Sequence, residues 1–191
     1  EHFQGELRAY QKAGYDWLRF LHQHGFGGIL ADDMGLGKTA CCLALLQWLH
    51  EQNPQSRFLV VVPTSLVENW KAERDKFVNE LPIYIQYGPS RAEQPEELPT
   101  GLVVTSYNTL RNDIHMMQQI QWDYVALDES HAIKNPASQI AKAIRTLNAR
   151  NRLAISGTPI ENNTTELWSQ MHFANPGLLG SYQAFTEAYS S

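Results

Sequence analysis

The sequence predicts an α/β fold in which a mostly parallel sheet carries helices on both faces, and three observations predict it. Short apolar runs without polar alternation recur along the chain, as in strands that are buried on both faces. Helical stretches separate these runs, which is the order of elements in a doubly wound domain. Capping residues also stand where several of these helices should begin.

The expected elements alternate along the whole chain, and no internal repeat interrupts them. The expected strands are Gly28–Ala31, Phe58–Val62, Leu102–Thr105, Tyr124–Leu127 and Arg152–Ile155. The expected helices are Tyr10–His24, Thr39–Glu51, Leu66–Asn79 and Ala137–Leu147. Because residues 88–100 are rich in Pro and Glu, we expect them to form a surface loop.

The predicted helix starts rest on three pairs of residues. Ser65 with Glu68, and Asn163 with Glu166, match the capping-box pattern, and Asn135 precedes a proline suited to the first helical position. Ligands of open parallel sheets bind beyond the carboxyl ends of the strands. The loops that follow the five strands are therefore the candidate functional segments.

Composition predicts one globular domain spanning residues 1–191, since 43% of the residues are hydrophobic and the charges are scattered. The adjacent Cys41 and Cys42 have no spacing for a disulfide framework or a zinc site. No leader-like or membrane-length apolar run is present. We therefore expect an intracellular protein, in the cytoplasm, nucleoid or nucleus, with no membrane partner.

The loop after the first strand has the residues of a phosphate-binding loop. Gly35 and Gly37 leave room for backbone amides to point at a β-phosphate, Lys38 would bridge β and γ oxygens, and the Thr39 hydroxyl would bind Mg²⁺. The strict motif has glycine where Asp32 stands, so a glycine-rich turn before a lysine is the alternative. The predicted nucleotide-binding residues here are Asp33, Met34, Gly35, Leu36, Gly37, Lys38 and Thr39.

Two adjacent carboxylates follow the fourth strand. Asp128 would hold Mg²⁺, and Glu129 would orient and deprotonate the attacking water, which with Lys38 gives the predicted catalytic set. A helix cap is the alternative for Asp128. His131 would couple this loop to the one at Ser156, and a purely structural histidine is its alternative.

In this order the loops resemble the first RecA-like lobe of superfamily-two helicase-type motors, specifically the SWI/SNF-type chromatin-remodelling ATPases. The resemblance covers nearly the whole chain and includes Asp32 of the phosphate loop. Ser130 departs from the family, which usually has Ala or Gly there, and we expect this change to be tolerated. The matching segments are 7–11, 32–39, 63–66 with Asn69-Trp70, 105–107, 128–131 with Lys134-Asn135, and 156–162.

The resemblance implies roles for further residues. Gln11 would read adenine through its amide, although an exposed helix glutamine is the alternative. Thr64, Ser65, Thr105 and Ser106 would contact a nucleic-acid backbone, and capping alone is the alternative for Ser65. The implied coupling residues are His131, Ser156, Gly157 and Thr158.

The resemblance also implies an activity: ATP hydrolysis with Mg²⁺ that drives translocation on double-stranded DNA and remodelling of protein–DNA complexes. A second RecA-like lobe would supply an arginine finger, and residues 178–191 are too few for another sheet, so we expect a weakly active single lobe. A net charge of −5 argues against DNA binding by this lobe alone. A DExH-type RNA or DNA helicase, or a non-catalytic module that docks nucleotide or a partner, are the alternatives.

Overall fold

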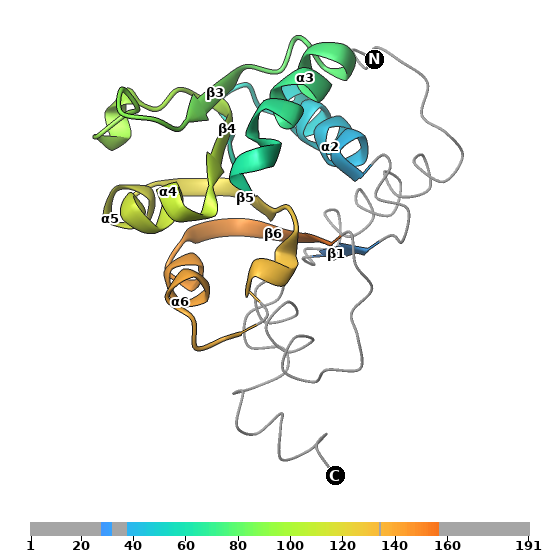
Figure 1. Cartoon of the computed structure of the whole chain (residues 1–191). Helices are drawn as coiled ribbons and strands as arrows, with labels where there is room; N and C mark the ends of the chain where they lie inside the picture. Colours follow the sequence, from blue (N-terminus) through green and yellow to red (C-terminus); the bar gives the residue numbers. More distant parts are fainter. Residues whose placement is uncertain (1–27, 32–37, 134, 157–191) are drawn as a thin grey trace.

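A six-stranded parallel sheet forms the centre of the computed structural model, which describes residues 28–31, 38–133 and 135–156 (Figure 1). The strand order is β1-β6-β5-β2-β4-β3, and each pair of neighbouring strands runs parallel. The strands are β1 Gly28–Ala31, β2 Arg57–Val62, β3 Ile83–Gln86, β4 Gly101–Ser106, β5 Gln121–Leu127 and β6 Asn148–Ser156. The five predicted strands are confirmed.

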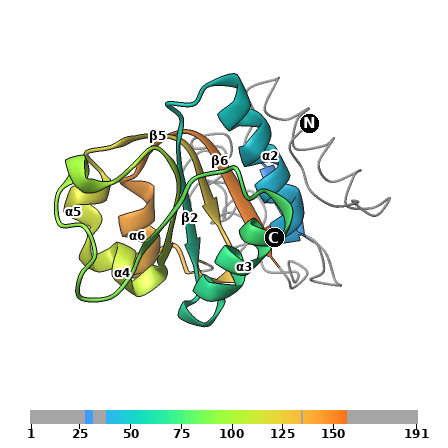
Figure 2. The same ribbon diagram turned by 90° about the horizontal axis from the view of Figure 1, so that it is seen from above.

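Helices cover both faces of the sheet, as predicted. Figure 2 shows α2 and α3 on one side of the strands, and α4, α5 and α6 on the other. The α-helices are α2 Lys38–Gln52, α3 Val67–Phe77, α4 Tyr107–Asn112, α5 Ile114–Met117 and α6 Gln139–Arg145. Three short 3₁₀ helices complete the described elements: η1 Thr64–Leu66, η2 Pro95–Glu97 and η3 Ser130–Ile133.

The central strand β2 shows why its sequence is a continuous apolar run. Phe58, Val60 and Val62 pack into the core cluster beneath α2 and α3, whereas Leu59 and Val61 pack into the cluster on the other face. All five side chains are fully buried. Since successive strand residues point to opposite faces, a strand covered on both sides needs apolar residues at every position.

The sheet contains one strand more than the sequence predicts. Strand β3 pairs only with β4 and lies at the edge of the sheet, where its first three residues, 83–85, are only half-buried. Its sequence Ile-Tyr-Ile-Gln is short and mixes polar with apolar residues, so it lacks the continuous apolar run that marks the inner strands.

Two of the predicted helix caps are wrong in detail. Ser65 lies within η1, and α3 begins after Leu66 with no side-chain cap. The Asn135 Oδ1 accepts a hydrogen bond from the Ala137 amide and so closes a separate turn, while Ser138 caps α6 by accepting from the Ala141 amide. The predicted helix at residues 10–24 and the cap at Asn163 lie outside the described residues.

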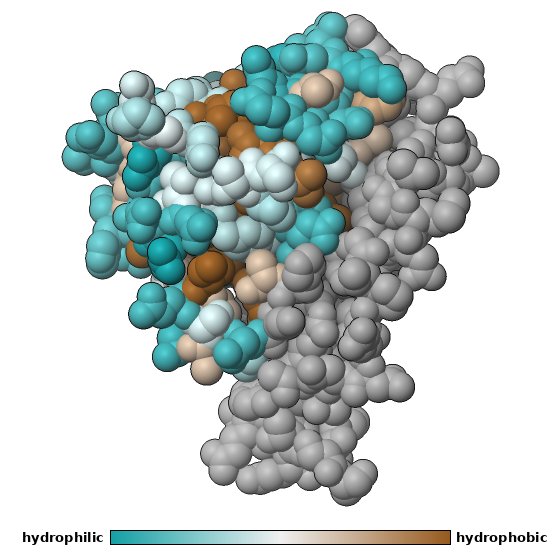
Figure 3. Space-filling model, in the orientation of Figure 1, coloured by the Kyte–Doolittle hydropathy of each residue, from teal (hydrophilic) through white to brown (hydrophobic). Residues whose placement is uncertain are grey.

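The segment 88–100 lies on the surface, as predicted, and is held to the domain by polar contacts. Arg91 donates to both carboxylate oxygens of Asp113, at 2.9 and 3.0 Å. The Gln86 side chain bonds to both the carbonyl and the amide of Ala92. Figure 3 shows mainly hydrophilic residues over the described surface on this side of the molecule.

Within the described ranges, no helix has the length and apolar character needed to cross a membrane.

Candidate active site

The candidate site lies where three neighbouring strands end. Ala31 of β1 pairs with Ser156 of β6, and Ala154 of β6 pairs with Leu127 of β5. The carboxyl ends of β1 and β5 are therefore separated only by β6, a distance of about 10 Å at the usual strand spacing. The loops after β1 and β5 are the predicted phosphate loop and the predicted acidic loop.

Helix α2, the next described element after β1, begins at the predicted phosphate-binding lysine. Its first residue is Lys38, its second, Thr39, is half-buried, and the helix then continues to Gln52. Ala40, Leu43 and Leu46 anchor it to the sheet and are almost fully buried. The partial positive charge of such a helix N-terminus favours an anion. Residues 32–37 and the Lys38 side chain lie outside the described part of the chain.

Asp128 directly follows β5 and is held on all sides. Its amide donates to the Val61 carbonyl of β2 at 2.8 Å, and its own carbonyl accepts from the Tyr107 hydroxyl at 2.7 Å. The carboxylate accepts from the Trp70 indole N–H at Oδ2, at 2.7 Å, and from the Glu129 amide at Oδ1, at 2.9 Å. Asp128 is only 7% exposed, so these charge-assisted bonds replace the water that burial removes.

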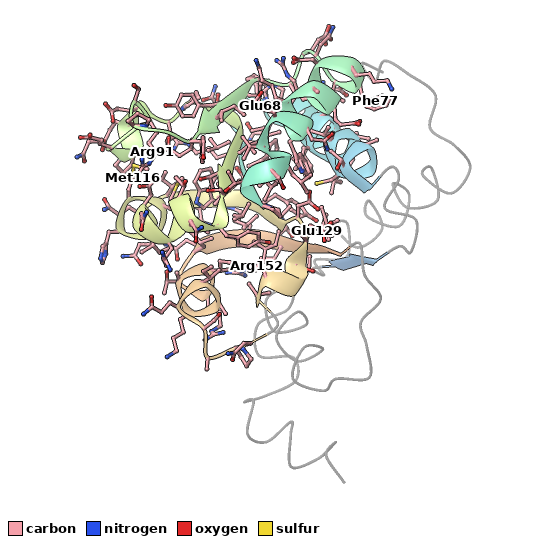
Figure 4. All side chains as sticks on the ribbon, in the orientation of Figure 1. Glu68, Phe77, Arg91, Met116, Glu129 and Arg152 are labelled. Carbon is pink, nitrogen blue, oxygen red and sulfur yellow. The ribbon has the colours of Figure 1, made fainter. Side chains whose placement is uncertain are left out.

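Glu129 has the strained backbone that is common at functional sites. Its φ is +53°, the one positive φ among the described residues other than glycine. Holding such a conformation costs about 1–3 kcal/mol, which the surrounding structure must supply. Figure 4 shows Glu129 where β5 ends and η3 begins. Unlike Asp128, this side chain is partly exposed, so it is accessible to water and ligand.

Two buried residues, Tyr107 and Ser130, lie beside the two carboxylates and suit this environment. Burial, and then the negative charges of Asp128 and Glu129, raise the pKa of the Tyr107 hydroxyl well above its ordinary value. Tyr107 therefore stays protonated and remains a donor to the Asp128 carbonyl. Ser130 is completely buried, so only a small side chain fits there. This burial is consistent with the expectation that Ser130 is tolerated where the resembled family usually has Ala or Gly.

Comparison with known proteins decides the family. The family model described as the SNF2-related domain matches residues 10–191. The chain belongs to the SNF2-related domain family. It is 40% identical over 192 residues to the "Putative ATP-dependent helicase/translocase YwqA" of Bacillus subtilis. This match covers 98% of this chain and 21% of that protein. It is also 37% identical to the chromatin-remodeling ATPase INO80 of Sclerotinia sclerotiorum, covering 98% of this chain and 12% of that protein.

The solved structures agree with this assignment of the SNF2-related domain. The chain superposes on the SWI2/SNF2 ATPase core of Sulfolobus solfataricus in complex with dsDNA with a TM-score of 0.89. The two are 38% identical, and the match covers 97% of this chain and 39% of that one. The predicted RecA-like α/β fold and the resemblance to the first lobe of SWI/SNF-type ATPases are confirmed. The chain spans about a fifth or less of the length of the curated relatives named above.

The first predicted nucleic-acid segment of this SNF2-related domain lies at the same edge of the sheet. Thr64 and Ser65 form the start of η1, directly after β2, and both are exposed. The one turn of η1 closes through the Leu66 amide and the Pro63 carbonyl at 2.9 Å. Contact of Thr64 and Ser65 with DNA stays a prediction.

The second predicted segment has its hydroxyls engaged within the protein. Thr105 is fully buried and donates to the Gln86 carbonyl at 2.8 Å. Ser106, 1% exposed, donates to the Thr109 hydroxyl and accepts from the Thr109 amide, which caps α4. These hydroxyls stabilise the domain. The DNA contact predicted for them stays a prediction, and it would require these bonds to be exchanged.

Several predicted residues of the SNF2-related domain are described only in part or not at all. His131 belongs to η3 and Ser156 ends β6, but their side chains lie outside the described part. Among the described residues no three His, Cys, Asp or Glu side chains form a metal-binding group. Mg²⁺ is usually bound by one or two carboxylates together with substrate phosphates, so Asp128 alone suits it. The predicted residues outside the described ranges are Gln11, Asp33, Met34, Gly35, Leu36, Gly37, Gly157 and Thr158.

Sequence reasoning missed the two aromatic donors to Asp128. Trp70 and Tyr107 both lie within segments that resemble family motifs, Asn69-Trp70 and Thr105-Ser106-Tyr107. That position was a usable signal. Their partner could not be named from the sequence, because Trp70 and Asp128 are 58 residues apart and meet only through the strand order.

Proposed function

We propose that this chain is the ATP-binding lobe of a larger DNA-dependent ATPase that translocates on double-stranded DNA and remodels protein–DNA complexes. One observation carries the proposal: a buried, hydrogen-bonded Asp128 and a strained, accessible Glu129 follow β5, two strands away from β1, the strand that precedes α2. Family membership supports the choice of ATP, because the relatives are named ATP-dependent helicases and ATPases.

The site residues divide the work of hydrolysis. The start of α2, with Lys38, binds the phosphates, and Gln11 reads the adenine. Glu129 orients the attacking water and accepts its proton. Asp128, whose carboxylate is held in place by the bonds from Trp70 and the Glu129 amide, would hold Mg²⁺ together with Thr39. Bound there, the ion would neutralise charge on the phosphates.

The proposed DNA-binding surface is the end of the sheet next to η1. Thr64 and Ser65 are exposed there and present small hydroxyls and a short helical turn to a phosphate backbone. The relative from Sulfolobus solfataricus was solved in complex with dsDNA, which supports duplex DNA as the partner. Because the net charge of −5 disfavours DNA binding by this lobe alone, the proposal includes basic residues supplied by a second lobe.

Duplex-stimulated ATP hydrolysis by the full-length protein tests this function. Glu129→Gln and Lys38→Ala should each lower the stimulated rate by at least about 100-fold, since each removes a group that acts on the reacting phosphates or water. Glu96→Gln and Lys142→Ala, which change exposed residues on η2 and α6, are the matched controls. A wild-type rate in either site variant would contradict the proposal.

The relatives do not favour the alternative of a helicase of a related DExH group, and the Bacillus relative is named a helicase/translocase, a name that covers both functions. The two functions differ in strand separation. A translocase should hydrolyse ATP on duplex DNA without displacing a labelled strand, whereas a helicase should release that strand.

A further inference from the structure

Asp128 is fixed from both faces of the sheet by aromatic residues that the hydrolysis mechanism does not use. Trp70 belongs to the core cluster on the α2–α3 side, and Tyr107 belongs to the cluster on the α4–α6 side. Each reaches the end of β5 with one polar atom, the indole N–H or the phenol O–H. Two helices on opposite faces of the sheet therefore meet at this one residue.

The Trp70 bond fixes the orientation of the carboxylate. The indole N–H can only donate, and it lies 2.7 Å from Oδ2, while the Glu129 amide holds Oδ1. With both oxygens bonded to different parts of the chain, the carboxylate plane cannot rotate freely. Trp70 is itself fully buried, so its ring has no alternative position without disturbing the core.

Both aromatic residues are connected to the predicted DNA side of the domain. Trp70 lies in the first turn of α3, which follows η1 without a break, and η1 contains the exposed Thr64 and Ser65. Tyr107 is the first residue of α4, and Ser106 before it pairs with Val62 at the end of β2. A displacement of η1 or of the start of α4 would therefore move a donor to Asp128.

We propose that Trp70 and Tyr107 are positioning residues that couple DNA binding at η1 and α4 to the orientation of Asp128 and Glu129. The inference rests on the proposed function, because it assumes that DNA binds at η1 and nucleotide at the acidic loop. Trp70 fixes the orientation of the Asp128 carboxylate. Tyr107 fixes the position of the Asp128 backbone carbonyl, which directly precedes Glu129. DNA binding then changes nucleotide binding through these two hydrogen bonds.

The experiment measures this coupling at equilibrium in the full-length protein. The affinity for a fluorescent DNA duplex is measured with and without Mg²⁺ and a non-hydrolysable ATP analogue, and the ratio of the two Kd values is the coupling factor. Linkage requires that the analogue's affinity change with DNA by the same factor, which gives an internal check. Neither measurement depends on turnover.

Trp70→Phe and Tyr107→Phe delete the donor atoms and keep most of each ring. Both should reduce the coupling factor toward one, a loss of about fivefold or more at the usual size of such couplings. Trp70→Phe should also raise the Mg²⁺ concentration needed for half-maximal analogue binding. The matched controls are Trp122→Phe, whose buried indole donates to the Met117 carbonyl, and Tyr124→Phe, another buried phenol in β5.

The outcomes separate the two proposals. Loss of coupling in both site variants, with the controls near wild type, supports the inference. Coupling within twofold of wild type in Tyr107→Phe and in a folded Trp70→Phe overturns it, even with an intact ATPase. If Trp70→Phe does not fold, Tyr107→Phe decides alone. A wild-type protein that binds neither duplex nor analogue overturns the proposed function, and this inference with it.

Discussion

At the scale of single residues, the core contains two tyrosine hydroxyls that must stay protonated for the chain to fold. Tyr107 is 7% exposed and Tyr124 is 2% exposed, and burial raises the pKa of both hydroxyls above the ordinary value of 10.0. For Tyr107 the carboxylates of Asp128 and Glu129 add to this effect. Ionising either tyrosine would place a negative charge in the core, so the folded state requires both to be neutral.

These shifts predict a loss of stability at alkaline pH. Because the folded pKa exceeds the unfolded one, the contribution is fully present below pH 10.0 and is lost as pH rises above it. Above that pH, each buried tyrosine should lower the free energy of unfolding by at most about 1.4 kcal/mol for each unit of pH. Urea unfolding of the chain on both sides of pH 10.0 measures this slope.

Tyr124→Phe should remove one tyrosine's share of that slope. Tyr87→Phe is the matched control, because Tyr87 is 49% exposed and its phenol lies outside the core. Equal slopes in the wild type and in Tyr124→Phe would contradict the assignment of the alkaline transition to the buried phenol.

At the scale of elements, the inner strands and the main helices could be predicted, whereas the edge strand and two of the helix caps could not. Strands β2, β4 and β5 are buried on both faces, so their residue types are strongly constrained. The half-buried β3 is under no such constraint. Asn135 and Ser138 both carry short polar side chains suited to capping, and only the chain path decides which of them caps α6.

The start of β4, which lies against Pro82 just before β3, illustrates a constraint that depends on packing. Gly101 opens β4 with φ +92°, and a Cβ there would lie 2.8 Å from the Pro82 carbonyl oxygen and 2.9 Å from the Pro82 Cβ. That carbonyl already accepts from the Leu102 amide at 2.8 Å, which keeps it in place. Only glycine therefore fits at the start of this buried strand.

Gly101→Ala should destabilise the chain by more than Gly88→Ala does. Both positions have positive φ, which costs about 1–3 kcal/mol for alanine, but nothing lies within 4 Å of a Cβ at Gly88. The clash at Gly101 should add about 1–3 kcal/mol more. Denaturant unfolding of the two variants measures the difference, and equal destabilisation would show that Pro82 moves away without cost.

At the scale of the whole molecule, the sequence located the candidate site because its residues sit at strand ends. Asp128 and Glu129 could be placed at the same edge of the sheet as the predicted phosphate loop once the sheet was expected to be parallel, since carboxyl ends then share one edge. The strained φ of Glu129 and the bonds from Trp70 and Tyr107 could not be predicted, because they depend on how α3 and α4 pack across the sheet. The same packing buries Thr105 and Ser106.

In the proposed function this site is one side of a nucleotide-binding site, and this predicts how activity depends on the rest of the protein. The chain covers 39% of the Sulfolobus ATPase core and 21% of the Bacillus relative, and the proposed function includes a second lobe that closes over the nucleotide. An arginine supplied from outside the first lobe raises phosphoryl-transfer rates by a factor of about 10³–10⁵.

The 191-residue chain alone should therefore bind ATP weakly and hydrolyse it at a rate that duplex DNA barely changes. The full-length protein should be strongly stimulated by the same duplex. Steady-state ATPase assays of both proteins at matched concentrations measure the two ratios, with Glu129→Gln in each as the background. Robust stimulation of the chain alone would show that it contains a complete site and would contradict the two-lobe arrangement.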